Sequence, residues 1–236
     1  PSRNAMTVIL AEVFQKATPA EAKLIAYLSQ GNLGPAYSSP DFGIADKQML
    51  KALGEKSLDL FKQKGDLGLV AQEIKRLSDE DTKKLSIDQV YKHLWEIAEA
   101  GGEGSQEKKQ RLISKLLEEL DPLSAKYVVR IILAKLRTGF SDMTILDSLS
   151  WMLAGDKSLR KNIEAIYNGR ADLGEVAELV KNKKSLDDIN PKIGTPVIMA
   201  KAERATSTGD VWTRNGECAV EYKLDGLRVQ CHISKT

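Results

Sequence analysis

Three charged residues near the end of the sequence have the types and spacing expected of a site that handles a phosphate. Lys223 stands two residues before the pair Asp225-Gly226, and Arg228 stands two residues after it. The apolar and aromatic residues around them are typical of β-strands, and an Asp-Gly pair is typical of the tight turn between two strands. We therefore expect a hairpin that holds the Lys223 amine and the Arg228 guanidinium beside a bound phosphate.

Lys223 has the chemistry of a nucleophile. Attack on the α-phosphorus of a nucleoside triphosphate requires a neutral amine, whereas an exposed lysine is almost wholly protonated near neutral pH. Burial and a nearby cation, either Arg228 or a divalent metal, would favour the neutral amine, and the cation would also stabilise the reacting phosphorus centre. Glu221 is two residues before Lys223, so on a strand both side chains point to one face. The plainer alternative is a surface Asp-Gly turn with incidental charges.

A short internal repeat predicts two helix starts. Residues 65–71, Gly-Asp-Leu-Gly-Leu-Val-Ala, are echoed by residues 171–177, Ala-Asp-Leu-Gly-Glu-Val-Ala. A basic residue precedes each copy, Lys64 in the first and Arg170 in the second. Because a helix start exposes unpaired N–H groups, each copy is a candidate phosphate site, and Gly65 belongs to the first. The alternative is that each aspartate caps its own helix and the glycines relieve crowding between helices.

Two loops between predicted helices are further candidates for phosphate contacts. The first loop runs into a helix start that carries Gly104, Ser105, Gln106, Lys108 and Lys109. Lysines at a helix N-terminus oppose the helix dipole, so their placement there is unfavourable unless an anion lies nearby. The second loop is Arg137-Thr138-Gly139, at which we expect one helix to end. The alternative for Arg137 is a cap on the last carbonyls of that helix.

The rest of the sequence must position these residues, and its pattern changes near Pro191. Before that point apolar residues recur at helical spacing, which predicts roughly ten to twelve short helices in two halves related by the repeat. Four starts carry capping residues, namely Thr18, Ser86, Ser105 and Asp121. The later pattern predicts the first strands of an α+β domain. We expect a helical domain over residues 1–190 and the beginning of a second domain over residues 191–236.

Composition sets a few further limits. Of the 236 residues, 35 are Lys or Arg and 33 are Asp or Glu, so the net charge is +2 and any basic surface must be local. Neither a membrane-length apolar run nor a charged-then-apolar leader occurs, which predicts a soluble protein that is not exported. We interpret Cys218 and Cys231 as small buried thiols. With only two histidines and no metal-ligand spacing, we expect no metal site from these residues.

Together these segments resemble a known family. Lys-x-Asp-Gly-x-Arg at residues 223–228 resembles motif I of the covalent nucleotidyltransferases, in which the lysine becomes linked to AMP or GMP. The helical part resembles the N-terminal DNA-binding domain of ATP-dependent DNA ligases of the archaeal type, related to the eukaryotic replicative enzyme. The resembling segments are Gly-Asp-Leu-Gly near residue 66, Gly-Glu-Gly-Ser-Gln at residues 102–106, Leu-Arg-Thr-Gly at residues 136–139 and Ala-Asp-Leu-Gly near residue 172. They occur in the family's order and cover nearly the entire chain.

The resemblance implies an activity, its ligands and its partners. Lys223 would attack ATP, with Glu221 and Arg228 on the nucleotide; AMP would then pass to the 5′-phosphate at a nick, where the 3′-hydroxyl displaces it. Magnesium would accompany the phosphates, held mostly by residues of later family motifs. The helical domain would hold nicked duplex DNA at its minor groove without reading sequence. The resemblance further implies roles in DNA replication, repair, recombination and cell division, a monomer in the cytoplasm at the nucleoid, and a sliding clamp as a further partner to test.

The sequence also departs from the family, and other classes share part of its pattern. It ends thirteen residues after Lys223, before the later motifs, and it begins without methionine, so we expect a truncated portion of a longer enzyme. RNA capping enzymes and RNA ligases share Lys-x-Asp-Gly but lack a helical domain of this size ahead of it. NAD-dependent DNA ligases share it too, but arginine is not typical at the position of Arg228. A non-catalytic helical DNA-binding or scaffold module is the remaining alternative.

Overall fold

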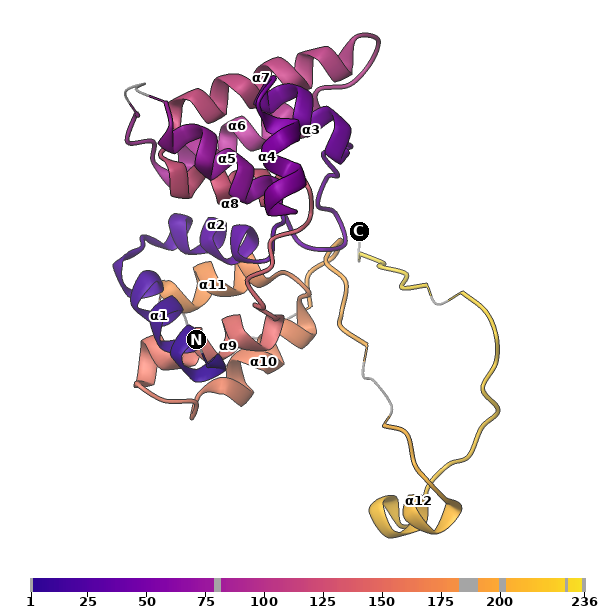
Figure 1. Ribbon diagram of the computed structural model, residues 1–236. Helices are drawn as coiled ribbons and strands as arrows, with labels where there is room; N and C mark the ends of the chain where they lie inside the picture. Colours follow the sequence, from indigo (N-terminus) through magenta and orange to yellow (C-terminus); the bar gives the residue numbers. More distant parts are fainter. Residues whose placement is uncertain (1, 79–81, 183–190, 200–202, 228, 235–236) are drawn as a thin grey trace.

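The computed structural model describes residues 2–78, 82–182, 191–199, 203–227 and 229–234, and within these ranges its regular structure is entirely helical (Figure 1). The helices are α1 (Arg3–Lys16), α2 (Pro19–Ser29), α3 (Asp46–Leu53), α4 (Ser57–Lys64), α5 (Leu67–Arg76), α6 (Ile87–Glu99), α7 (Ser105–Glu119), α8 (Pro122–Ile132), α9 (Asp142–Ala154), α10 (Arg160–Gly169), α11 (Leu173–Lys181) and α12 (Thr208–Asn215). Eleven of these helices lie before residue 190 in the described ranges, which confirms the expected all-α character of the N-terminal part, and α12 lies beyond it.

Helices α1 to α11 form two lobes, each around its own apolar core, and α12 lies apart from both (Figure 1). Lobe I consists of α3 to α8, and fully buried side chains such as Met49 and Ile113 lie in its core. Lobe II consists of α1, α2, α9, α10 and α11, with Phe14 and Leu149 in its core. The chain leaves lobe II after α2, forms lobe I, and returns through residues 133–141. The core of lobe II therefore combines α1 and α2, which precede lobe I in the sequence, with α9 to α11, which follow it.

Three of the four predicted helix caps are confirmed. The hydroxyl oxygens of Thr18 and Ser86 each accept a hydrogen bond from the backbone N–H three residues later, at 3.3 Å. The Asp121 carboxylate accepts bonds from the backbone N–H groups two and three residues later, at 2.9 and 3.1 Å. Ser105 differs because it is the first residue of α7. Gly104 precedes it in the left-handed conformation, with φ 72°, and no side chain caps this helix.

The end of α8 corrects the expectation for Arg137. α8 ends at Ile132, five residues before Arg137, because Ala134 adopts the left-handed conformation with φ 53°. The backbone N–H of Lys135 then donates to the Arg130 carbonyl at 2.8 Å, which satisfies a carbonyl of the last turn. Arg137 therefore does not cap the helix. It lies in the loop of residues 133–141, and its own φ is 54°.

The internal repeat marks two equivalent helix crossings, α5 against α8 and α11 against α2. The carboxylates of Asp66 and Asp172 each accept a bond from the backbone N–H three residues later, at 3.0 and 2.9 Å. Gly68 faces α8, and Gly174 faces the ring of Tyr27 on α2. Both copies therefore show the alternative arrangement, in which the aspartates cap their helices and the glycines relieve crowding. Phosphate binding at these helix starts stays a prediction.

The strands expected after Pro191 are not formed among the described residues. Residues 217–227 and 229–234 are extended but pair with no neighbouring strand, and Val220, Tyr222 and Leu224 are 87 to 91% exposed. An isolated hairpin is marginal at best, because its apolar face needs further strands or a helix to cover it. Within the described ranges, no helix combines the length and the apolarity needed to cross a membrane.

Candidate nucleic-acid interface

Asp66 gathers two arginines from different elements of lobe I. Its carboxylate accepts from the Arg130 guanidinium on α8, at 3.3 Å from Nε and 3.1 Å from Nη2. Nη1 of Arg137, from the 133–141 loop, is 3.2 Å from the same carboxylate. Arg130 is mostly buried, whereas the Arg137 side chain is 59% exposed. One carboxylate with two guanidiniums leaves this cluster with a net positive charge.

The Asp66 carboxylate is held in its ionised form. Its burial alone would raise its pKa, but the hydrogen bonds from Arg130 and the backbone, together with the charges of Arg130 and Arg137, lower the pKa below its ordinary value. A hollow of about 40 Å³ lies at this point, lined in part by Gly65, Gly68 and Lys135. The cluster is therefore a fixed, charged rim around a small surface hollow.

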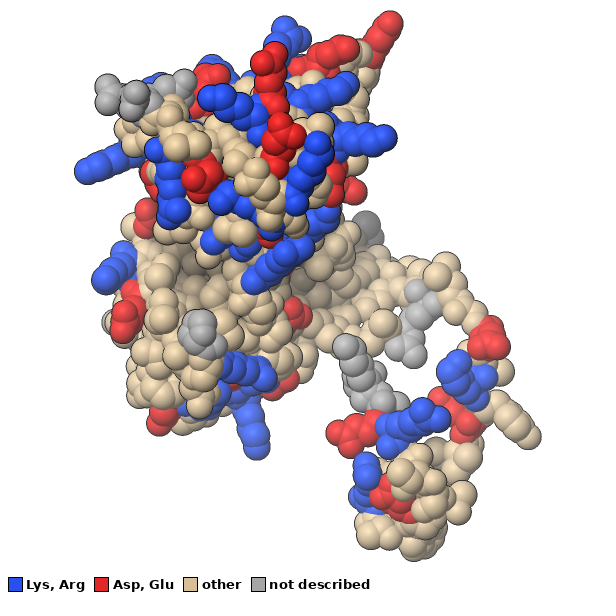
Figure 2. All heavy atoms as spheres, viewed as in Figure 1, with Lys and Arg blue, Asp and Glu red and all other residues tan. Residues whose placement is uncertain are grey.

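The first turn of α3 connects this cluster to the Gly104 loop. Asp46 accepts at 2.7 Å from the ammonium of Lys135, which is two residues before Arg137 in the chain. Gln48, two residues later, donates to the Gln106 side chain at 2.8 Å. Two loops that the sequence separates by about thirty residues therefore meet at one end of α3. In the face shown in Figure 2, Lys and Arg side chains gather more densely over lobe I than over lobe II.

The lysines predicted at the start of α7 have different environments. Lys108 is exposed, as a phosphate contact requires. Lys109 is only 7% exposed, and its ammonium donates to the Phe42 carbonyl at 2.6 Å. The unfavourable position of Lys109 at a helix start is thus offset by a buried carbonyl instead of by an external anion. We therefore leave Lys109 out of the candidate surface, although we predicted it as a phosphate contact.

The basic residues that precede the two repeat copies both have acidic partners. Lys64, at the end of α4, lies 3.3 Å from Glu73, and Gly65 follows it in the left-handed conformation with φ 63°. Arg170 lies 3.3 Å from Glu175 in lobe II, and the next residue donates its N–H to the Pro196 carbonyl. Only Lys64 and Gly65 thus lie beside the Asp66 cluster, since Arg170 belongs to the other lobe.

The residues expected to bind the nucleotide lie outside the helical lobes. The Lys223 side chain is 92% exposed, its ammonium is 3.4 Å from the Asp225 carboxylate, and Glu221 is also exposed. Arg228 lies outside the described residues. Cys218 and Cys231 are both exposed free thiols, so the interpretation as buried thiols is wrong. These residues become exposed because the extended segment has no covering layer among the described residues.

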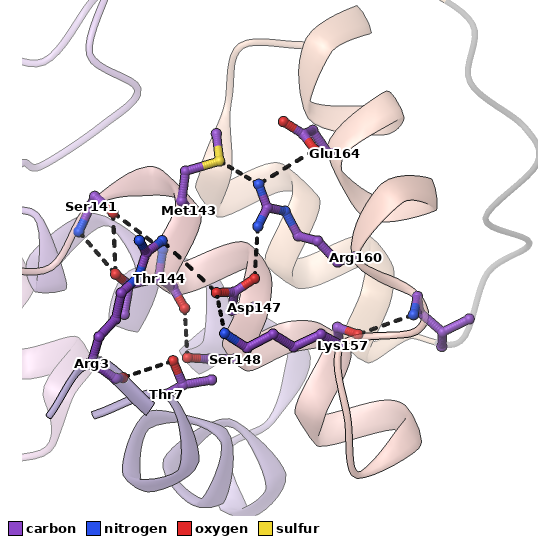
Figure 3. A network of polar contacts seen from close by, with 12 residues as sticks. Arg3, Thr7, Ser141, Met143, Thr144, Asp147, Ser148, Lys157, Arg160 and Glu164 are labelled. Atoms are coloured by element: carbon purple, nitrogen blue, oxygen red, sulfur yellow. Dashed lines mark hydrogen bonds and ion pairs between the residues drawn. The ribbon is translucent and has the colours of Figure 1, made fainter. Parts of the chain in front are cut away.

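A second charged cluster in lobe II was missed by the sequence analysis (Figure 3). Asp147 of α9 is 2% exposed and lies 2.7 Å from Arg160, 3.0 Å from Lys157 and 3.9 Å from Arg3. Burial would raise the pKa of Asp147, but the hydrogen bonds and charges of Lys157 and Arg160 lower it below its ordinary value. This cluster joins α1, α9 and α10, so its role is structural. Neither Asp147 nor the Asp66–Arg130 pair has a local sequence signal, because the partners come from separate elements.

Comparisons with known proteins agree with this architecture. A family model for the DNA ligase N terminus matches residues 1–150. DNA ligase 2 of Thermofilum pendens is 37% identical over 99% of the chain, and the DNA ligase of Sulfurisphaera tokodaii is 36% identical over 98%. A probable DNA ligase of Dictyoglomus turgidum is 37% identical over 98% of the chain. The chain spans 42%, 42% and 40% of the length of these three relatives, respectively.

Proposed function

We propose, from the premise that this chain belongs to the DNA ligase N-terminus family, that it is part of an ATP-dependent DNA ligase that seals nicks in duplex DNA. The observation that carries the proposal is the alignment with DNA ligases along nearly the whole chain, together with the Lys-Leu-Asp-Gly-Leu-Arg segment at residues 223–228. The proposal includes action in DNA replication, repair and recombination. A monomeric state, a cytoplasmic location at the nucleoid and a sliding-clamp partner belong to it as well.

Lys223 is the residue that we assign to the covalent step. Its neutral amine attacks the α-phosphorus of ATP, forming a P–N bond as the bond to pyrophosphate breaks, and the lost proton passes to solvent. AMP is then transferred to the 5′-phosphate at the nick, which frees the lysine. Finally the 3′-hydroxyl attacks that phosphate and releases AMP. Glu221 and Arg228 are assigned to the nucleotide.

Magnesium is the metal that the chemistry of ATP implies. Among the described residues, no group of three or more His, Cys, Asp or Glu side chains is arranged to hold a metal ion. Magnesium prefers oxygen ligands and often takes several of them from phosphates and water. We therefore assign no metal ligand among the described residues.

The DNA-binding part of the proposal rests on the surface at the first turn of α3. The group beside Asp66 consists of Lys64, Gly65, Arg137, Thr138 and Gly139. The group at the start of α7 consists of Gly104, Ser105, Gln106 and Lys108. Backbone N–H groups at a helix start and exposed cations bind phosphates without reading bases. Arg170 is assigned as a separate contact on lobe II. Left-handed glycines at positions 65, 104 and 139 allow the backbone to approach a phosphate closely.

Labelling with nucleotides tests the proposed reaction class. Full-length protein incubated separately with α-labelled ATP, α-labelled GTP and adenylate-labelled NAD should acquire, from ATP alone, a covalent label that survives denaturing gel electrophoresis. The label should then leave the protein when nicked duplex with a 5′-phosphate is added. A label from GTP would indicate a capping-type enzyme, and a label from NAD would indicate the other ligase class. No label from any nucleotide would favour the non-catalytic module.

Removal of charge from the two loops tests the DNA surface. We expect Lys108→Ala and Arg137→Ala each to weaken binding of the full-length protein to nicked duplex about fivefold, uniformly across DNA sequences. Each change should also lower the slope of log Kd against log salt by about 0.9, because one phosphate contact is lost. The measurement is fluorescence anisotropy at several salt concentrations.

Lys92→Ala is the matched control for this test. Lys92 is an exposed lysine of lobe I on α6, and its ammonium is 2.6 Å from Asp88. It should leave both the affinity and the salt slope unchanged. An unchanged salt slope for Lys108→Ala would remove the residues at the start of α7 from the proposed surface. An unchanged salt slope for Arg137→Ala would remove the residues beside Asp66.

A further inference from the structure

The two copies of the internal repeat differ in what their aspartates bind beyond the helix cap. Asp172 in lobe II accepts from the neutral phenol of Tyr27 at 2.7 Å. Asp66 in lobe I instead holds two guanidiniums, those of Arg130 and Arg137. Since both carboxylates cap their helices equally well, capping does not explain the two arginines. The Asp66 copy therefore has an additional role.

The two arginines are held in different ways. Arg130 binds both oxygens of the carboxylate, and its side chain packs where Gly68 leaves room, so its donors are used inside lobe I. Arg137 contacts the carboxylate through Nη1 only. A guanidinium has five N–H donors, so most of those on Arg137 remain for another acceptor. Its exposure places those donors at the surface of the molecule.

The backbone beneath Arg137 is also fixed. Arg137 and Ala134 are the two non-glycine residues with positive φ among the described residues, at 54° and 53°. A non-glycine residue in this conformation is uncommon and persists only where its surroundings hold it there. The carboxylate cannot follow a moving Arg137, because Arg130 and the α5 backbone bind it at the same time.

We propose that Asp66 is a positioning residue, which holds the Arg137 guanidinium so that its free N–H groups face a DNA phosphate. The inference rests on the proposed function, in which Arg137 contacts DNA. Asp66 itself does not touch the phosphate. By holding the Arg137 side chain in place, Asp66 reduces the conformational entropy that this side chain would otherwise lose on binding DNA. The positive charge of Arg130 balances the negative charge of Asp66. The opposite arrangement, in which Asp66 competes with DNA for Arg137, predicts the opposite sign in the test below.

The sign of the Asp66→Asn effect on DNA affinity tests the proposal. Asparagine is as good an N-cap as aspartate, so the start of α5 is kept while the charge is lost. Removal of a negative charge from a basic surface would by itself strengthen binding to DNA. Positioning predicts the reverse, a Kd for nicked duplex about fivefold higher in the full-length protein, with a lower salt slope. Asp66→Ser, which also caps, should give the same result.

Three comparisons complete the experiment. Asp172→Asn, the same change in the other repeat copy, should leave the Kd and the salt slope unchanged. In the Arg137→Ala background, Asp66→Asn should weaken binding no further, because the residue that it positions is gone. Binding by Asp66→Asn and Asp66→Ser that is equal to or tighter than that of the unaltered protein would overturn the positioning role alone. Failure of the unaltered protein to bind duplex at all would overturn the proposed function and this inference together.

Discussion

Lys223→Ala in the full-length protein is expected to abolish the covalent label from ATP and to lower nick sealing roughly a thousandfold or more. The reason is chemical, because the substitution removes the only atom that we assign to the P–N bond. The measurements are the label retained on the protein after denaturing gel electrophoresis and the sealing rate on a nicked duplex. DNA affinity should change much less, since Lys223 follows the last helix, belongs to neither lobe, and has a side chain that is 92% exposed.

Two further variants separate the nucleophile from its charge. Lys223→Arg keeps the positive charge but offers no neutral amine near pH 7, so it should lose the label as completely as Lys223→Ala. Lys192→Ala removes an exposed lysine that lies 3.4 Å from Glu175, and it should keep full labelling. Normal sealing by Lys223→Ala would refute the covalent assignment. If Lys223→Arg keeps the label and Lys223→Ala loses it, the role of Lys223 is electrostatic and not nucleophilic.

Gly174→Ala is expected to destabilise lobe II by roughly 2–3 kcal/mol. A Cβ at this position would lie 2.3, 2.5 and 2.8 Å from three ring atoms of Tyr27, far inside van der Waals contact. The Tyr27 ring cannot move away easily, because it is 4% exposed and its hydroxyl is bonded to Asp172. Helix propensity alone predicts the opposite sign, since alanine favours a helix by about 1 kcal/mol over glycine. Denaturant unfolding followed by circular dichroism measures which effect dominates.

Gly209→Ala is the matched control for that prediction. Gly209 is also inside a helix, α12, but its nearest neighbour to an added Cβ is the Ser207 hydroxyl at 3.7 Å. This change should therefore leave the free energy of unfolding of lobe II unchanged. If Gly174→Ala unfolds at the same or a higher denaturant concentration than the unaltered protein, close packing of α11 on α2 is not what requires the glycine.

Local sequence signals were reliable where the physics is local. The caps at Thr18, Ser86 and Asp121 depend on groups within three residues, and all three are formed as expected. The Asp-Leu-Gly repeat likewise marked two helix starts and two close crossings. The end of α8 was misplaced because nothing at Ala134 signals a left-handed residue, which is usually glycine.

Signals that depend on distant partners were less complete. The predicted hairpin around Lys223 needs neighbouring strands that the described residues do not supply, so its apolar residues are exposed. Lys109 lies four residues before the buried Ile113, so helical spacing places it on the inner face of α7, unlike its exposed neighbour Lys108. Its partner there, the Phe42 carbonyl, depends on the tertiary structure alone. No spacing in the sequence reports on that carbonyl.

The amino-acid sequence by itself determined the helical periodicity, three of its four predicted caps, the repeated helix starts and the resemblance to DNA ligases. Tertiary structure alone decided that the Gly104 loop and the Arg137 loop meet at the first turn of α3, and that Asp66 holds Arg130 and Arg137. The physical reason is range. Caps and periodicity act within about one or two helical turns, whereas Asp66 and Arg130 are 64 residues apart and become neighbours only when the helices of lobe I pack around their common core.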